Sequence, residues 1–262
     1  PFYTYVLQVL TRRLQEIGRQ VMLFTVPKGE QADEAVRQLL AFQVEGLVLT
    51  STTTTAVVAD ECYQHGTPLV LFNRFEPGVR TNGIACDNAE GGRLVANHLL
   101  DAGHQRLAYI AGLAHTRAST QRGKGFTDRL RERGVMDEQV QLVQAEYTYE
   151  SGYKAARQLL AQDEPPDAIF CANDIMAIGA MDAARYEFGL KIPDELSIIG
   201  FDDIPAASWP AYHLTTVRQP VDQMIEAAIA QLLDGVPDPF PTGTLTLLEG
   251  ELVRRGSARL LP

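Results

Sequence analysis

Two adjacent carboxylates follow an apolar segment close to residue 200. Residues 197–201 form an apolar run around Gly200 that leads directly into Asp202 and Asp203. Such a run is typical of a buried parallel strand, and open α/β sheets bind ligands beyond the carboxyl ends of their strands. A carboxylate at that edge can accept hydrogen bonds from neighbouring hydroxyls or from an amine. The alternative is a helix N-cap, and we assign the ligand role to Asp202 and the capping role to Asp203.

A second apolar run ends in the same way. Residues 168–172 lead into Asn173 and Asp174, and a helix is expected to begin at Ile175. An amide or a carboxylate at this position can contact a ligand or cap the helix that follows. We therefore expect one of the two side chains to face a ligand, with Asn173 as the candidate and Asp174 in a structural role.

Strands and helices alternate along almost the whole chain, which favours an α/β fold with parallel sheets. The 262 residues suit two lobes, and no linker rich in Pro, Gly or Ser separates the halves. The chain opens on a helix, although a parallel lobe normally starts with a strand. Expected helices extend to residue 17, over 31–42, to about 65, and over 89–102, 119–133, 151–162, 175–188 and 221–233. Expected strands cover residues 21–24, 46–49, 68–72, 81–86 (at a sheet edge), 106–111, 140–145, 168–172, 197–201, 244–248 and 251–253.

Three segments resemble the effector-binding core of the LacI/GalR family of bacterial transcription regulators. They are Ile-Gly-Phe-Asp-Asp at 199–203, Ala-Asn-Asp at 172–174 and Thr-Thr-Val-Arg-Gln-Pro at 215–220. The resemblance implies a two-lobed, periplasmic-binding-protein-like fold in which each lobe is a parallel sheet flanked by helices, with a ligand cleft between lobes. It also implies an N-terminal lobe of residues 1–87 plus 219–245 and a C-terminal lobe of 88–218 plus 246–262. The family's helix-turn-helix domain is absent from this chain.

The resemblance assigns further ligand contacts to the second half of the chain. Arg122 matches the family's Arg-x-x-x-Phe helix start, where a cation opposes the helix dipole, so a ligand oxygen or Asp202 is expected to offset its charge. The alternative is a solvated charge on an exposed turn. Asp87 lies at the first crossing between lobes and serves equally well as a helix cap. Tyr147 falls at an aromatic wall of the pocket. Gln219, at a later crossing, contacts the ligand or only forms a hinge.

The first lobe is expected to contribute two pairs of residues. Phe2 and Tyr3 match an aromatic pair whose rings would stack on a sugar or a planar base. Asn73 and Arg74 follow the strand at 68–72 and would supply hydrogen-bond donors. The alternatives are packing at a helix start for Phe2 and a turn for Asn73 and Arg74.

Composition and missing motifs narrow the function. The 23 basic and 33 acidic residues give a net charge of −10, which repels phosphate backbones, so this chain should bind DNA poorly by itself. Three cysteines in apolar runs and the histidines lack metal-ligand spacing, so the thiols are expected to be buried in a reducing cytoplasm. No nucleophile elbow or phosphate-binding loop is present, and the pair Gly91-Gly92 indicates close packing. We expect no catalytic residues, no metal and no cofactor.

The expected function is the effector-sensing domain of a LacI-type regulator. By resemblance it would be a cytoplasmic homodimer in which lobe closure on a sugar or polyol alters operator binding through the absent domain. Arg74 and Arg122 together leave room for a sugar acid. The alternatives are a solute-binding protein of an ABC transporter, which shares the fold, and an enzyme. The first lacks the regulator-like segments, and the second lacks a catalytic constellation. No apolar stretch approaches the roughly 20 residues that span a bilayer.

Overall fold

The computed structural model describes residues 1–27, 30, 32–50, 54–114, 116–136, 139–236 and 243–260. Contacts within the chain divide it into two compact units, and after Phe2 the chain passes between them three times. Unit 1 contains Asp87–Gln219 and Glu249–Pro262, together with Pro1, and unit 2 contains Phe2–Cys86 and Pro220–Leu248.

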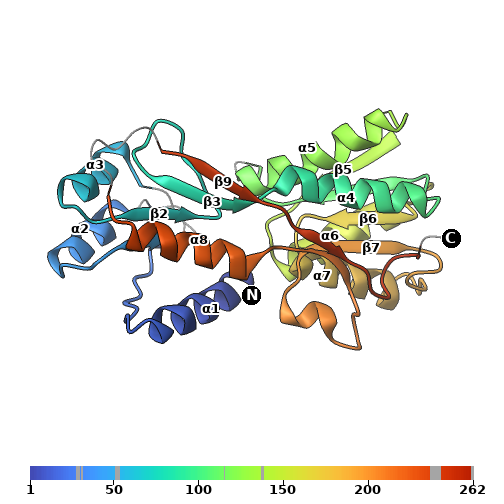
Figure 1. The fold of residues 1–262 in the computed structure, drawn as a ribbon. Helices are drawn as coiled ribbons and strands as arrows, with labels where there is room; N and C mark the ends of the chain where they lie inside the picture. The colour runs from blue at the N-terminus through green and yellow to red at the C-terminus, as the bar shows by residue number, and fades with distance from the viewer. Residues whose placement is uncertain are drawn as a thin grey trace. The chain divides into compact units, whose positions relative to one another are not determined.

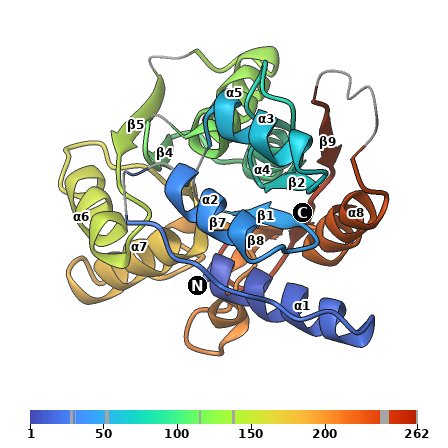
Figure 2. The same ribbon diagram turned by 90° about the vertical axis from the view of Figure 1, so that its left-hand side faces the viewer.

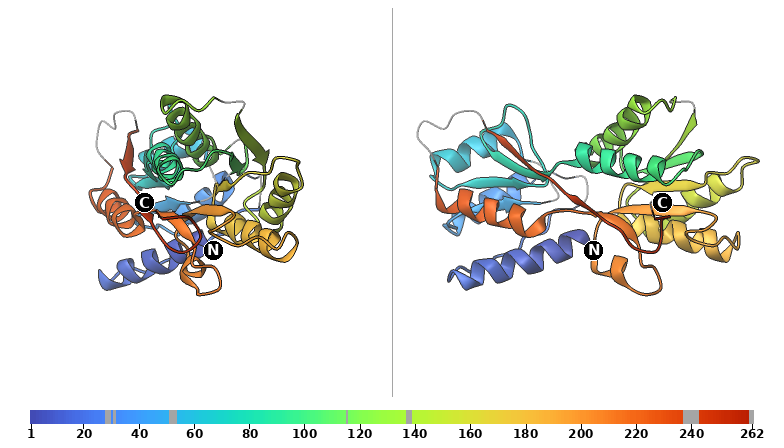
Figure 3. Two further views of the ribbon diagram at one scale, coloured as in Figure 1. Left: turned by 90° about the vertical axis from the view of Figure 1, so that its right-hand side faces the viewer. Right: turned by 45° about the vertical axis from the view of Figure 1, so that its right-hand side comes forward.

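Unit 1 is built on a six-stranded sheet in the order β10-β8-β7-β6-β4-β5. Neighbouring strands are parallel except β10, which runs antiparallel to β8. Helices α4 and α5 lie on one face of this sheet, and α6 and α7 lie on the other (Figure 3). The elements are α4 (Asn88–Asp101), β4 (Leu107–Ala111), α5 (Arg117–Glu132), β5 (Val140–Gln144), α6 (Tyr149–Leu160), β6 (Ala168–Cys171), α7 (Asp174–Tyr186), β7 (Ser197–Asp202), the 3-10 helix η2 (Pro205–Ser208), β8 (Thr215–Arg218) and β10 (Glu251–Val253).

The core of unit 1 forms around central strands that are mostly apolar. All residues of β4, β6 and β7 are buried, as expected for parallel strands covered on both faces. Tyr109, Phe126 and Phe170 form an aromatic cluster with ring centroids 5.0 to 6.0 Å apart. This packing fixes the ends of β6 and β7, where the polar exit residues lie.

Helices α4 and α5 pack closely because glycines face each other across the contact. A Cβ atom at Gly92 would overlap the carbonyl oxygen of Arg122, and one at Gly125 would overlap the carbonyl oxygen of Ala89. The close packing expected for Gly91-Gly92 is therefore confirmed, since a Cβ at Gly91 would also overlap the Phe201 ring.

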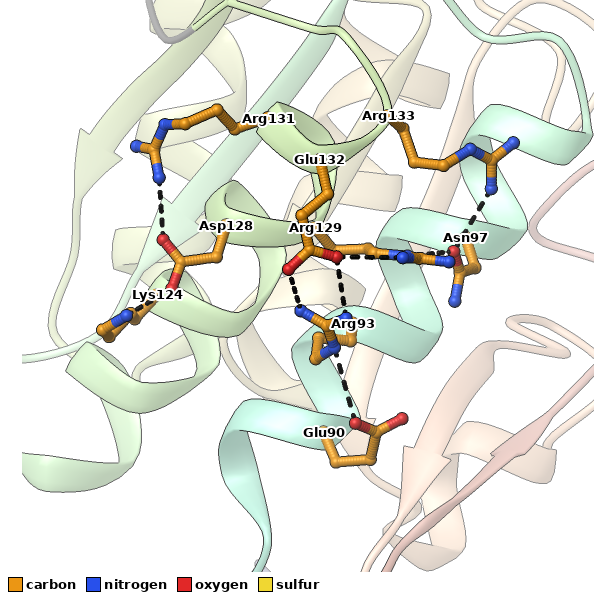
Figure 4. Close-up of polar contacts among 9 residues, drawn as sticks. All are labelled: Glu90, Arg93, Asn97, Lys124, Asp128, Arg129, Arg131, Glu132 and Arg133. Carbon is orange, nitrogen blue, oxygen red and sulfur yellow. Dashed lines mark hydrogen bonds and ion pairs between the residues drawn. The ribbon is translucent and has the colours of Figure 1, made fainter.

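Farther along the same two helices, exposed charged side chains add a second set of contacts (Figure 4). Arg93 binds Glu132 through two hydrogen bonds of 2.8 Å, and Arg129 donates to Asn97 at 2.7 Å. Arg129 also donates to Glu132 at 2.9 Å, so one carboxylate joins two arginines. Exposed pairs contribute little singly, but this connected network aligns α4 and α5 along their length.

Unit 2 is built on a smaller sheet of four parallel strands in the order β1-β2-β3-β9. Helix α8 packs against β2 and β3, α1 packs against α8, and α3 packs against β2 (Figures 1 and 2). The elements are α1 (Phe2–Glu16), α2 (Asp33–Ala41), β1 (Leu47–Leu49), α3 (Ala56–Gln64), β2 (Leu69–Phe72), β3 (Asn82–Cys86), α8 (Val221–Leu233) and β9 (Leu245–Leu248).

Two sequence expectations for unit 2 are wrong. Residues 21–24 form no strand, and Met22 and Leu23 are 52% and 63% exposed, because no described strand lies beside them to pair with their backbone. Residues 81–86 are not at a sheet edge, because β3 lies between β2 and β9. The three cysteines, Cys62, Cys86 and Cys171, are buried as expected. No helix of the described residues is long and apolar enough to cross a membrane.

Candidate functional site

Asp202 is the last residue of β7 and lies in unit 1. Its side chain is almost buried, with the residue 9% exposed. The Oδ1 atom accepts a hydrogen bond from Gln219 Nε2 at 2.7 Å and lies 3.3 Å from Arg122 Nη2. No hydrogen bond from the described residues reaches Oδ2. Asp202 therefore holds one oxygen in a fixed polar contact and keeps one oxygen available as an acceptor.

The backbone at this point is strained. Asp202 has φ of 118° and Asp203 has φ of 55°, both in the region that L-residues seldom occupy. Such conformations cost on the order of 1 to 3 kcal/mol each and concentrate at functional sites. Gly200 allows the Asp174 side chain to pack against β7 just before these two residues, since a Cβ at Gly200 would overlap Asp174 Oδ1.

Arg122 is a buried cation on α5, only 2% exposed. Its Nε donates to Asn88 Oδ1 at 2.7 Å, and Nη1 donates to the carbonyl oxygen of Ala172 at 2.5 Å. The guanidinium carbon lies 3.6 Å above the centre of the Phe201 ring. The expectation that Asp202 would offset this charge is confirmed by their ion pair.

A second carboxylate, that of Asp174, lies near Asp202. Asp174 is fully buried, accepting from Ile204 N at 2.8 Å and from the hydroxyl of Thr216. Burial and then the neighbouring charge of Asp202 raise the pKa of Asp174 well above its ordinary range. Burial also raises the pKa of Asp202, while Arg122 and the hydrogen bond from Gln219 oppose this increase. Asp174 has the structural role expected of it, because it holds the loop that follows β7.

Asn173 was expected to face a ligand, and the structure shows it as the N-cap of α7. Its Oδ1 accepts from the backbone of Met176 at 3.1 Å, and its Nδ2 has no partner among the described residues. The amide can therefore cap the helix with one atom and still donate to a ligand with the other. A ligand role is compatible with this geometry and stays a prediction.

The capping role expected for Asp203 is wrong. Helix η2 has Ile204 at its N-cap with no side-chain hydrogen bond. Asp203 instead accepts from Arg218 Nε at 2.6 Å and lies 2.7 Å from Arg255 Nη2. The physical reason is the position of Asp203 next to strand β8. Arg218 of β8 pairs in register with Asp202 of β7, and Asp203 follows in a left-handed turn beside it. The two neighbouring carboxylates thus bind different arginines.

The remaining unit 1 candidates lie in separate local contacts. Asp87 caps α4 by accepting from Glu90 N at 2.9 Å, so the capping interpretation describes its contact. Tyr147 has φ of 62°, its ring covers Gly112, and its hydroxyl lies 3.2 Å from Thr116 Oγ1. Gln219 joins the Asp202 cluster directly.

In unit 2, Phe2 and Tyr3 begin α1, with ring centroids 5.4 Å apart in an edge arrangement. Phe2 is 8% exposed, consistent with packing, and Tyr3 is 38% exposed. Asn73 and Arg74 follow β2, where Asn73 has φ of 59° and a buried Oδ1 without a partner among the described residues. The ligand roles of these four residues stay predictions.

Two contributors to the cluster were not proposed as site residues. Asn88 positions Arg122 by accepting from Nε, and Phe201 covers the face of its guanidinium. Both lie next to a candidate, since Asn88 follows Asp87 and Phe201 precedes Asp202. Their contacts with Arg122 join segments 34 or more residues apart, which the sequence alone does not reveal.

The arrangement suits binding of a polar small molecule. The described residues contain no group of three His, Cys, Asp or Glu side chains that could hold a metal ion. What they offer at the ends of β6 and β7 is a buried carboxylate with an available oxygen, supported by Arg122, Gln219 and a capping asparagine. Such a carboxylate accepts hydroxyl or amine donors.

Known proteins resemble this chain over its full length. A family profile described as a periplasmic binding protein-like domain matches residues 96–258. The HTH-type transcriptional repressor CytR of Escherichia coli strain K12 is 30% identical over 263 residues, which cover 100% of this chain and 77% of that repressor.

Two solved structures have the same fold. The transcriptional regulator CelR in complex with cellobiose matches with a TM-score of 0.81 and 27% identity, covering 98% of this chain and 79% of that protein. The dimeric Lac repressor matches with a TM-score of 0.84 and 25% identity, covering 99% of this chain and 94% of that protein. The expected α/β, periplasmic-binding-protein-like fold is confirmed.

Proposed function

Since this chain belongs to the LacI/GalR family of transcription regulators, we propose that its Asp202 cluster binds a sugar or sugar derivative as the regulator's effector. The relatives are transcriptional repressors, so the chain is the effector-sensing part of a regulator and neither an ABC-transporter component nor an enzyme. The observation that carries the sugar assignment is the nearly buried Asp202, with one oxygen fixed and one available. Two vicinal hydroxyls can donate to such a carboxylate. The match to a cellobiose-bound regulator supports the same ligand class.

The proposed ligand contacts in unit 1 are Asp202 at the centre and Arg122, Asn173 and Gln219 around it. Asp202 would accept from hydroxyls, and Asn173 Nδ2 would donate to a ring or hydroxyl oxygen. Asp87 and Tyr147 are proposed as further contacts on the family resemblance alone.

From unit 2 we propose Phe2, Tyr3, Asn73 and Arg74 as further contacts. The support is again the resemblance, together with the buried Oδ1 of Asn73, an acceptor that a ligand hydroxyl would satisfy. The two lobes, with the boundaries expected from the resemblance, are proposed as the bodies whose closure responds to the ligand.

We further propose that the protein acts in the cytoplasm as a homodimer and binds operator DNA through a helix-turn-helix domain. Support comes from the repressor relative and from the similarity to the dimeric Lac repressor. The net charge of −10 makes this chain unsuited to hold DNA itself. A ligand changes operator binding only by its differential affinity for two conformations.

A thermal-shift screen tests the sugar assignment. The purified chain is heated with separate panels of sugars, polyols, nucleosides and amino acids. A ligand that binds only the folded state raises the melting temperature. At a ligand concentration of 100 times its Kd, it stabilises the folded state by about 2.7 kcal/mol. We expect stabilisation from members of the sugar or polyol panels. Stabilisation by nucleosides or amino acids alone would contradict the proposal.

A further inference from the structure

The hydrogen bonds of the Asp202 cluster are distributed unevenly between donors and acceptors. Arg122 uses each of its three nitrogens, donating to Asn88 and to the carbonyl oxygen of Ala172 and pairing with Asp202. Gln219 uses its Nε2 on Asp202, while its Oε1 is buried without a partner among the described residues. The cluster therefore leaves two acceptors for a ligand, Asp202 Oδ2 and Gln219 Oε1, beside the neutral amide donor Asn173 Nδ2.

The charges of the cluster agree with this inventory. The positive charge of Arg122 is balanced by Asp202 at 3.3 Å. The nearby Arg218 and Arg255 are paired with Asp203, and Arg218 also donates to Glu251 at 2.8 Å. No guanidinium described around Asp202 is left without a carboxylate partner. An anionic ligand would meet the Asp202 carboxylate in a poorly solvated place, where like charges repel strongly.

We propose that the Asp202–Arg122 pair makes this site selective for a neutral ligand rich in hydroxyls, against its carboxylate or phosphate derivatives. The inference rests on the proposed function and narrows its ligand class. It departs from the sequence expectation that Arg122 leaves room for a sugar acid, because Arg122 is already balanced by Asp202 within the protein. Asp202 is the residue that sets the selectivity.

The same geometry predicts how the selectivity can be reversed. In Asp202→Asn the amide keeps an oxygen that can face Arg122, but the counter-charge is lost. Arg122, 2% exposed, then becomes a buried cation without a carboxylate, which is costly unless an anion binds. Asp203→Asn is the matched control, because it makes the same chemical change one residue away. It alters the pairs with Arg218 and Arg255 and leaves the Asp202–Arg122 pair in place.

The first experiment needs no variant. Calorimetric titration of the 262-residue chain compares matched ligands: glucose with glucuronate, galactose with galacturonate, and ribose with ribose 5-phosphate. For each neutral sugar that binds, we expect the anionic partner to bind at least about tenfold more weakly, a difference of about 1.4 kcal/mol. An anionic partner that binds as tightly as its neutral counterpart, or more tightly, overturns the proposal. That result would leave the assignment of a sugar effector intact.

The second experiment uses inorganic phosphate as the probe and does not depend on the sugar. Phosphate is titrated into the wild type, Asp202→Asn and Asp203→Asn at one ionic strength. We expect Asp202→Asn to bind phosphate at least about tenfold more tightly than the other two proteins, whereas equal affinity in all three overturns the proposal. Both variants gain the same net charge, so a difference between them reports the charge of Arg122. If this result holds while no sugar binds, charge selection stands and the assignment of a sugar effector fails.

Discussion

At the residue scale, the proposed effector site depends on the contacts of one buried arginine. Arg122 contacts Asn88 on α4, the carbonyl oxygen of Ala172 after β6, and Asp202 at the end of β7. The Phe201 ring covers its face. One side chain therefore links a helix and two strand ends around the proposed ligand position. Because the group is desolvated, its contribution depends on every partner being present.

Removing Arg122 should be strongly destabilising. In Arg122→Leu, Asp202 loses its cationic partner in a nearly buried place, and a broken buried pair costs about 3 to 5 kcal/mol. Urea unfolding of the two proteins measures the difference. The double variant Arg122→Leu/Asp202→Asn is the control, because it removes both charges and should lose less than the sum of the single variants. Strict additivity would show that the pair is not coupled.

Asp174 gives a prediction about pH. Its pKa is raised by burial above the ordinary value of 3.8, so above that pH the folded state binds more protons than the unfolded state. Stability from this group therefore decreases as the pH rises from about 4 toward the folded-state pKa. Asp174→Asn cannot titrate and keeps an oxygen for Ile204 N.

The free energy of unfolding of Asp174→Asn, relative to that of the wild type, should accordingly become larger with rising pH over this range, because only the wild type loses stability from this group. Urea unfolding at several pH values measures it. The exposed Asp222→Asn on α8 is the matched control for the loss of a surface carboxylate. A difference between Asp174→Asn and wild type that stays constant with pH would contradict the raised pKa.

Residue roles were predicted from the sequence only where a local pattern decides them. Asp202 could be predicted as a site residue, because an apolar run that ends in a carboxylate is a local sequence pattern. The Asp203 assignment failed, since its arginine partners Arg218 and Arg255 lie 15 and 52 residues away. Positive φ at both aspartates decides which way each side chain points, and no sequence pattern gave that turn.

At the element scale, the site depends on how closely α4 and α5 approach. Asn88 begins α4 and Arg122 lies in the second turn of α5, so their 2.7 Å contact needs the two backbones side by side. Glycines at the crossing permit it, and the Arg93–Glu132 contact continues it toward the far end. Packing of the helix pair thus positions the arginine that supports Asp202.

Gly125→Ala should separate the two helices. The added methyl would overlap the Ala89 carbonyl, a backbone group that cannot rotate away, so we expect a loss of at least about 2 kcal/mol in urea unfolding. Lys124→Ala, one residue away and exposed, is the control and should change stability by no more than about 0.5 kcal/mol. A Gly125→Ala protein as stable as the control would show that the helices can shift without cost.

Most elements were predicted from periodicity, because the central strands β4, β6 and β7 are short, mostly apolar runs that alternate with helices. The failure at residues 21–24 has a clear cause. The run Val-Met-Leu-Phe has the composition of a strand, but strand formation needs a neighbour, and the sequence does not state which strands are adjacent. The position of β3 between β2 and β9 was missed for the same reason, since β9 lies about 160 residues later.

At the scale of the whole molecule, two sheets are joined by three passages of the chain, and the proposed effector cluster lies at the end of the larger one. The family membership makes this chain part of a transcription regulator, and under the proposed function a ligand would change the conformation that sets operator affinity. The ligand's identity could not be predicted from the sequence, because the balance of donors and acceptors depends on which atoms are already paired. Only the structure shows which atoms of Arg122 and Gln219 are already paired.

The most direct test of the central claim is calorimetric titration of the sugar that gives the largest thermal shift, using wild type, Asp202→Ala and Asp203→Ala. The account predicts binding of one sugar per chain, a loss of at least about 2 kcal/mol in Asp202→Ala, and little change in Asp203→Ala. The two variants differ by one position and one set of arginine partners. Wild-type affinity in Asp202→Ala, or an equal loss in both variants, would contradict the assignment of the effector site to Asp202.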